Sequence, residues 1–188
     1  QDQTVQITDK HDIDFLGFAT KQNLISLILF SYINGKLIAK IQEIHEYYDD
    51  INSAVSSWLY QYYYKNQNKP KTLYVSLNKK DLNSLSKTLN IEVNKPIKGS
   101  KYEILMTAID NALEYLNTNY QVYVANKQAK LAAIHQLKEI LGVKKISTMI
   151  SFDISNLFSE NKVAGMVYLK DGDFVKSRYR KYIIDNPE

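Results

Sequence analysis

The sequence predicts an α/β protein in which a mixed sheet with flanking helices is followed by three further strands. Three observations predict this class: three strand-like segments after residue 12, alternating helix and strand patterns up to residue 145, and three more strand-like segments from residue 146. Alternation of this kind favours a sheet covered by helices. We therefore expect a polar tail over 1–11, one domain over 12–145 and the beginning of another over 146–188.

The first strands surround the dipeptide Asn34-Gly35. A short apolar run covers residues 15–20, a longer one covers 23–33, and a third covers 36–44. An Asn-Gly pair between two such runs is a strong hairpin signal, because both turn residues take positive φ. The pattern predicts three consecutive strands, of which the last two form a hairpin.

Helical patterns alternate with strands in the middle of the chain. Residues 49–67 have an acidic start and helical spacing, and they are followed by a strand at 72–77, a short helix at 81–89 and a short strand at 91–97. Ser100 and Glu103 have the spacing of a capping box, which predicts the start of a long helix. A second helical stretch covers 122–141 and ends at Gly142, a typical C-terminal cap.

The strand pattern then returns, with segments at 149–155, 163–170 and 174–184 and a predicted hairpin turn at Asp171-Gly172. Aligning residues 16–19 with 150–153 brings the two turn glycines to comparable distances and places Ala19 opposite Asp153. An internal repeat and two unrelated meanders both explain this similarity.

Composition excludes several classes of function. The chain has 188 residues and no cysteine, which excludes disulfides, thiol catalysis and Cys-ligated zinc. His11, His45 and His135 show no metal-ligand spacing. There is no apolar run of about 18 residues, as a membrane span requires, and the polar N-terminus does not resemble a signal peptide. We expect a cytoplasmic protein, whose net charge of +4 permits a nucleic-acid partner.

Asp153 interrupts the apolar segment 149–155 at its centre. A carboxylate in a buried strand is costly unless it is paired or bound to a metal ion. One interpretation is a ligand of Mg²⁺ or Mn²⁺ in a nuclease, where such ions activate water and stabilise a leaving oxygen. The alternative is a structural Asp that accepts hydrogen bonds from a neighbouring turn.

The region from residue 149 onward resembles the start of the endonuclease domain of the UvrC family, the C subunits of the bacterial excinuclease. The resemblance is carried by Phe152, Asp153, Ile154, Ser155, Val163, Gly165, Met166, Val167, Gly172, Lys176, Ser177, Tyr179 and Arg180. The upstream region resembles the part of UvrC that precedes this domain, through DFLGFA, NGKLIAK, WLYQYY and the segment with Pro96, Lys98 and Gly99. Asn156 and residues 158–160 depart from the family pattern.

This resemblance implies two ribonuclease H-like domains, of which the first is catalytically inactive because it has Ala19 where the second has Asp153. It implies that Asp153 is a catalytic residue and a ligand of Mg²⁺ or Mn²⁺ in an enzyme that cuts damaged double-stranded DNA 5′ to a lesion, in nucleotide excision repair. The implied partners are UvrB and, upstream, UvrA. The other catalytic carboxylates and DNA-binding modules of the family lie outside this sequence, so we interpret the chain as a fragment of a UvrC protein that is inactive alone.

Other charged and aromatic groups have two interpretations each. Lys176, Arg178 and Arg180 alternate, so a strand would place them on one face, either to bind DNA phosphates or as ordinary exposed charges. The aromatic run 58–64 could stack bases or belong to the core. We expect Asp12 and Asp14 to be solvated before the first strand. The acidic cluster comprises Glu43, His45, Glu46, Asp49 and Asp50, which we expect to form a charged loop.

Two classes of function therefore remain open from the sequence. The first is part of a metal-dependent endonuclease, and the second is a scaffold module that only binds DNA or other repair subunits.

Overall fold

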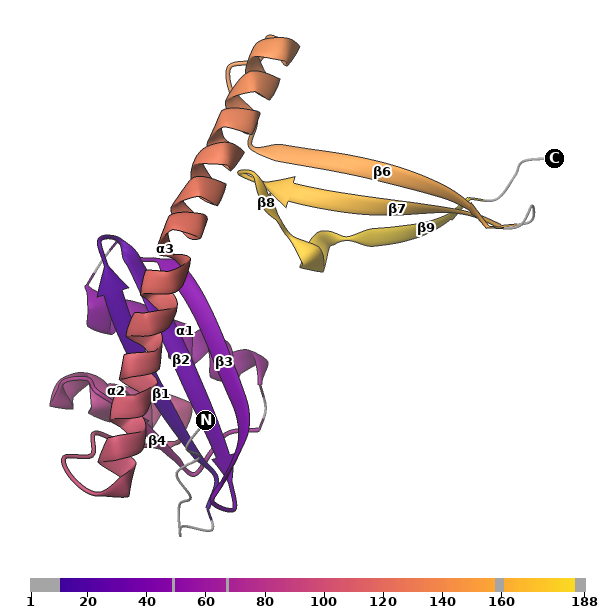
Figure 1. Ribbon diagram of the computed structural model, residues 1–188. Coiled ribbons are helices and arrows are strands. Elements are labelled where there is room, and N and C mark those ends of the chain that lie inside the picture. The colour runs from indigo at the N-terminus through magenta and orange to yellow at the C-terminus, as the bar shows by residue number, and fades with distance from the viewer. Residues whose placement is uncertain (1–10, 49, 67, 158–160, 185–188) are drawn as a thin grey trace. The chain divides into compact units, whose positions relative to one another are not determined.

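The computed structural model describes residues 11–48, 50–66, 68–157 and 161–184 (Figure 1). The chain divides into two compact units, Gln1–Tyr120 and Gln121–Glu188. Most of the predicted polar tail, Asp49 of the acidic cluster, and residues 158–160 lie outside the described residues. No helix in the described part of the chain is long and apolar enough to cross a membrane.

A five-stranded mixed sheet forms the centre of the first unit, as the sequence predicts. Its strands lie in the order β3-β2-β1-β4-β5, with antiparallel pairing from β1 to β3 and parallel pairing of β4 with β1 and β5. The parallel pairs follow from the helices that connect these strands, because a parallel neighbour requires a crossover. The strands are β1 (Ile13–Lys21), β2 (Leu24–Ile33), β3 (Lys36–Glu46), β4 (Thr72–Val75) and β5 (Glu92–Asn94).

Both predicted hairpin turns are confirmed. Asn34 and Gly35 have φ values of 50° and 76°, and Asp171 and Gly172 have values of 50° and 85°. Positive φ at both central residues matches the right-handed twist of the strands that they join. Because β3 continues to Glu46, three members of the predicted acidic loop lie on a strand instead: Glu43, His45 and Glu46.

Helices cover both faces of this sheet (Figure 1). On one face, α1 (Ile51–Lys65) and α2 (Lys79–Leu89) bury Val55, Leu59, Tyr63, Leu85 and Leu89 against Leu16, Leu27 and Leu29. On the other face, α3 (Ser100–Leu141) packs Ile104, Leu105, Ala108 and Ala112 against Phe15, Ile28 and Phe30. Both faces of the sheet are therefore packed against helices.

The two predicted helical stretches after Ser100 form one helix of 42 residues. No Gly or Pro interrupts the sequence between Ser100 and Leu141, so neither kind of helix breaker separates the two stretches. The predicted cap at Gly142 is confirmed: its φ is +64°, and the backbone N–H of Val143 donates to the Lys138 carbonyl.

Asp14 is buried, which contradicts the expectation that it is solvated. It is the second residue of β1, only 6% of its surface is exposed, and its carboxylate accepts a hydrogen bond of 2.6 Å from the Tyr63 hydroxyl. The sequence pattern missed it because β1 begins one residue before Asp14, at Ile13. Desolvation raises the pKa of Asp14, while the hydrogen bonds from Tyr63 and Ser31 act in the opposite direction.

This burial predicts a pH dependence of stability. A raised pKa means that the folded state keeps the Asp14 proton to a higher pH than the unfolded chain does, so stability decreases between the ordinary Asp pKa and the raised one. Asp14→Asn removes this titration, so we expect a smaller loss of stability over that pH range in urea unfolding. Asp110→Asn, at an exposed helix position, is the control and should keep the wild-type slope. If the free energy of unfolding changed equally with pH in the wild-type, Asp14→Asn and Asp110→Asn proteins, the prediction would be contradicted.

The second unit contains an antiparallel sheet in which β7 is the central strand. It pairs with β6 on one side and with both β8 and β9 on the other. The predicted third strand over 174–184 is wrong in its first half, because a 3₁₀ turn, η1 (Lys176–Arg178), separates the last two strands. The strands are β6 (Thr148–Leu157), β7 (Asn161–Lys170), β8 (Asp173–Phe174) and β9 (Arg180–Ile184).

Candidate functional site

Asp153 lies at the middle of β6, directly opposite Gly165 of β7. Its side chain is exposed, so the cost of burying a carboxylate does not apply to Asp153 in this structure. Among the described residues, none donates a hydrogen bond to the Asp153 carboxylate. A structural role in holding a neighbouring turn therefore finds no donor in the described part of the chain.

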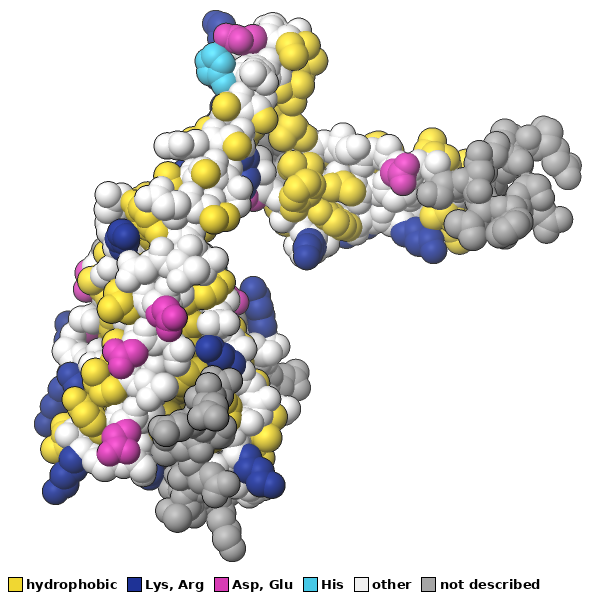
Figure 2. Space-filling model, viewed as in Figure 1, with side chains coloured by type: hydrophobic (Ala, Val, Ile, Leu, Met, Phe, Trp, Pro, Cys, Tyr) yellow, Lys and Arg dark blue, Asp and Glu magenta, His cyan; other side chains and the backbone are white. Residues whose placement is uncertain are grey.

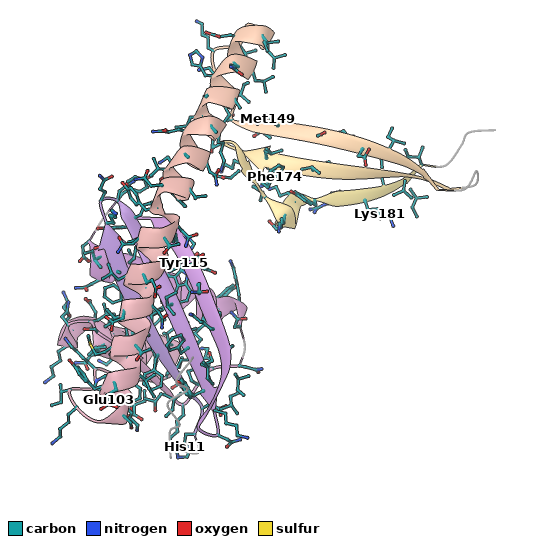
Figure 3. All side chains as sticks on the ribbon, viewed as in Figure 1. His11, Glu103, Tyr115, Met149, Phe174 and Lys181 are labelled. Atoms are coloured by element: carbon teal, nitrogen blue, oxygen red, sulfur yellow. The ribbon has the colours of Figure 1, made fainter. Side chains whose placement is uncertain are left out.

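The strand register defines which side chains share a face with Asp153. Directly opposite residues in a ladder carry their side chains on the same side of the sheet. Gly165 pairs with Asp153 on one side and with Lys181 of β9 on the other. Asp153, Gly165 and Lys181 therefore form one row across three strands, with no side chain at its centre; Lys181 is labelled in Figure 3.

Gly165 leaves open space beside the carboxylate. A Cβ atom built at Gly165 would have the Asp153 carbonyl oxygen as its nearest neighbour, at 3.9 Å. The glycine is therefore not required by close packing of the backbone. Because Gly165 has no side chain, the backbone between the Asp153 carboxylate and the Lys181 ammonium group is uncovered.

The opposite face of this sheet is apolar. Ile150, Phe152 and Ile154 of β6 are between 52% and 60% exposed, and the Phe152 ring lies 6.3 Å from that of Tyr182. Figure 2 shows hydrophobic side chains on the surface of this unit. The polar row of Asp153 and the apolar face are thus separated by the alternation of the strand.

The three basic residues predicted as one row do not form it. Lys176 and Arg178 lie in η1, and Arg180 is the first residue of β9. The Arg178 guanidinium lies 4.9 Å from the centre of the Tyr168 ring and donates to the Tyr168 hydroxyl at 3.2 Å. Arg180 donates to the carbonyl oxygens of Ser177 and Tyr179. Whether these residues bind DNA stays a prediction.

The first unit has a different residue at the position that corresponds to Asp153. Asp153 pairs with Gly165, and Gly165 lies five residues before the end of β7. In the first unit, Ile28 lies five residues before the end of β2, and it pairs with Gly17. Counted from the two hairpin turns, the residue at the register position of Asp153 is therefore Gly17, whereas the sequence alignment places Ala19 there. A Cβ atom built at Gly17 would overlap the Ala108 carbonyl group and the Ile109 nitrogen of α3.

Part of the acidic cluster lines a cleft of about 310 Å³ between β3 and α1. Glu43, which lies next to this cleft, accepts hydrogen bonds of 2.8 Å from the Trp58 indole and 2.6 Å from His45, and these lower its pKa against the opposing effect of desolvation. Trp58 stacks on Tyr62 with ring centres 5.2 Å apart. Within the aromatic run, Tyr63 is core and Tyr64 is 90% exposed. These contacts give Glu43 and His45 of the acidic cluster a structural role.

Asp153 fits a divalent metal ion as one ligand among several. Carboxylate oxygens are ligands that Mg²⁺ and Mn²⁺ prefer, and the space over Gly165 leaves the carboxylate accessible. Within the described ranges, no three His, Asp or Glu side chains come together as a metal site. Asp153 can thus contribute one ligand, and among the described residues it belongs to no group of three such side chains.

Comparisons with known proteins support the same two-part division. Residues 12–119 match the model of the UvrC ribonuclease H-like domain, and residues 138–188 match that of the UvrC RNAse H endonuclease domain. The chain is 35% identical to UvrABC system protein C of Malacoplasma penetrans over 99% of its own length and 32% of that protein's length.

Other relatives carry the same name. The protein from Mycoplasmoides gallisepticum is 35% identical over 95% of this chain and 30% of its own length. The protein from Desulfitobacterium hafniense is 30% identical over 97% of this chain and 29% of its own length. The chain therefore spans about a third of the length of the curated relatives that it matches.

Proposed function

The chain belongs to the UvrC family, and from this membership we propose that it is the central region of a UvrC subunit that cuts DNA 5′ to a lesion in nucleotide excision repair. The observation that carries the proposal is the position of Asp153: an accessible carboxylate at the middle of a strand, in the unit that matches the endonuclease model. In this proposal Asp153 is a catalytic residue and a metal ligand.

The residues of the second unit suggest how they would serve this reaction. Asp153 would hold Mg²⁺ or Mn²⁺ together with ligands from outside the described residues. Such an ion activates a water molecule and stabilises the leaving oxygen of a phosphodiester. Gly165 keeps the surface beside the carboxylate free, so that a DNA backbone can approach it without meeting a side chain.

The basic segment that follows the Asp171-Gly172 turn would contribute to DNA affinity. Lys176, Arg178 and Arg180 carry charges that suit a phosphate backbone, and such contacts give affinity that falls with salt and does not depend on sequence. The ring contact of Arg178 with Tyr168 would fix the orientation of its guanidinium. The proposed partners are damaged double-stranded DNA, UvrB and, upstream, UvrA, in the cytoplasm.

The first unit would serve as a scaffold without catalysis. Its counterpart of Asp153 is Gly17, and the backbone of α3 lies directly over that position. No metal ion or DNA strand could approach the sheet there while α3 remains in place. A purely structural or DNA-binding role is therefore the proposed function of this unit, and it is the second candidate for the whole chain.

A comparison of the 188-residue chain with a full-length protein that contains it tests the proposal. We expect the isolated chain not to cut DNA, with or without UvrB, because one carboxylate rarely suffices to hold Mg²⁺. The full-length protein should cut a lesion-bearing duplex 5′ to the lesion in the presence of UvrA, UvrB and Mg²⁺, and not after chelation. Mg²⁺-dependent nicking by the chain that Asp153→Ala abolishes would refute the expectation for the isolated chain. Failure of the full-length protein to make the 5′ cut would refute the proposed function.

A further inference from the structure

We propose that Lys181 binds the DNA phosphate at the Asp153 site, as the second functional side chain of that site. This inference rests on the proposed function, because it assumes that a DNA strand meets the sheet at Asp153. Lys181 is not among the basic residues that the sequence pattern selects, since Lys176, Arg178 and Arg180 alternate and Lys181 falls between their positions. The pairing of β9 with β7 selects it.

The register places Lys181 on the functional face. Lys181 pairs with Gly165 and Gly165 pairs with Asp153, so all three residues point to the same side of the sheet. Arg180, the residue before it, pairs with Met166 and points to the opposite side, where the exposed apolar residues of β6 lie. The first basic residue of β9 therefore faces away from Asp153, and the second shares its face.

The spacing suits a single phosphate group. Two strand spacings separate the Cα atoms of Asp153 and Lys181 by about 10 Å. Both side chains are exposed and able to turn toward each other, and the glycine between them leaves the intervening surface open. The described side chains of Asp153 and Lys181 form no ion pair with each other, so the carboxylate and the ammonium group are both available to bind a ligand.

The charges of Asp153 and Lys181, at the two ends of the row, suit a charged phosphodiester better than they suit a neutral ligand. A Lys ammonium binds phosphate oxygens as a point charge. The Asp153 carboxylate would repel the same oxygens unless a divalent cation lay between them, which is the role proposed for it above. A phosphate over Gly165 would thus have a positive charge on each side.

The first measurement is DNA binding at one fixed Ca²⁺ concentration, so that a divalent cation is present at Asp153, using the full-length protein and a duplex with one lesion. Loss of one phosphate contact should reduce the slope of log K against log salt by about 0.9. We expect this for Lys181→Gln and not for Lys181→Arg, which keeps the charge. Lys170→Gln is the matched control: it removes the same charge from an exposed position of the same sheet, on the opposite face, and should keep the wild-type slope.

The second measurement is the single-turnover rate of the 5′ incision at saturating DNA. Removing a group that contacts the transition state typically lowers the rate by about 10²-fold, and we expect this for Lys181→Gln while Lys181→Arg keeps most of the activity. Gly165→Val should also lower the rate, because it places a side chain over the phosphate position; its β-branched side chain suits a strand, and circular dichroism checks its fold.

The results separate the two proposals. If Asp153→Asn abolishes the 5′ cut while Lys181→Gln keeps both the wild-type slope and the wild-type rate, the inference about Lys181 is overturned and the proposed function stands. If Asp153→Asn keeps the 5′ cut, the proposed function fails, and Lys181 loses its stated role with it. A reduced slope and rate for Lys181→Gln, restored by Lys181→Arg, supports the inference.

Discussion

Replacing Asp153 by Asn in a full-length protein that contains this chain should abolish the proposed incision 5′ to a lesion. Asn keeps the shape of Asp but lacks the negative charge that a divalent cation needs from its ligand. Metal-ion stabilisation of a transition state is worth several kcal/mol, so the 5′ cut should slow by about 10³-fold or more. Because Asp153 is exposed, folding should change little.

A matched variant controls for the chemistry of the substitution. Asp171→Asn also converts an Asp of the same sheet into Asn, at a turn position with φ of 50° that Asn adopts readily. Mapping the 5′ cut on a lesion-bearing duplex with UvrA and UvrB should show a wild-type pattern for Asp171→Asn. A normal 5′ cut by the Asp153→Asn protein would show that Asp153 is not a catalytic metal ligand.

Replacing Gly17 by Ala should destabilise the first unit by about 3 kcal/mol, at the upper end of the usual cost of overpacking. The added Cβ atom would overlap the backbone of α3 at Ala108, and a backbone cannot turn aside as a flexible side chain can. Urea unfolding of the 188-residue chain measures the effect, with Gly165→Ala as the control. That glycine has room for a Cβ atom, so its replacement should cause no loss of stability.

Equal stabilities of the Gly17→Ala and Gly165→Ala proteins would contradict the close packing of β1 on α3. For the same reason, a new carboxylate in the first unit should restore no incision. Ala19→Asp would place it against the packed cluster between the sheet and α3, where no set of partner carboxylates exists among the described residues.

Local patterns in the sequence predict most of the fold. The strand and helix order up to β5, both hairpin turns and the cap at Gly142 depend on neighbouring residues, and the structure confirms them. The burial of Asp14 and the identity of the counterpart of Asp153 depend instead on contacts between segments that are distant in the sequence. The burial of Asp14 requires Tyr63 from α1, and the choice of Gly17 over Ala19 requires the strand register.

The candidate site shows the same division. One short motif is enough to predict Asp153, because a charged residue within an apolar segment is a local feature of the sequence. Lys181 could not be predicted from the sequence, because only the pairing of β9 with β7 shows that it shares a face with Asp153. The sequence does contain a signal for Lys181, because it belongs to a run of basic residues. The alternation of Lys176, Arg178 and Arg180, however, assigns only these three to one face.

The contact between Gly17 and Ala108 also has an evolutionary consequence. If the two units descend from one duplicated ancestor, mutation alone would hardly return a metal ligand to the first. An Asp at position 17 would collide with a helix backbone, so selection would remove the variant for instability before any catalytic benefit arose. A gain of function there would need concerted changes in β1 and α3. Descendant proteins would therefore gain a carboxylate at this position of the first unit only together with a new packing of β1 on α3.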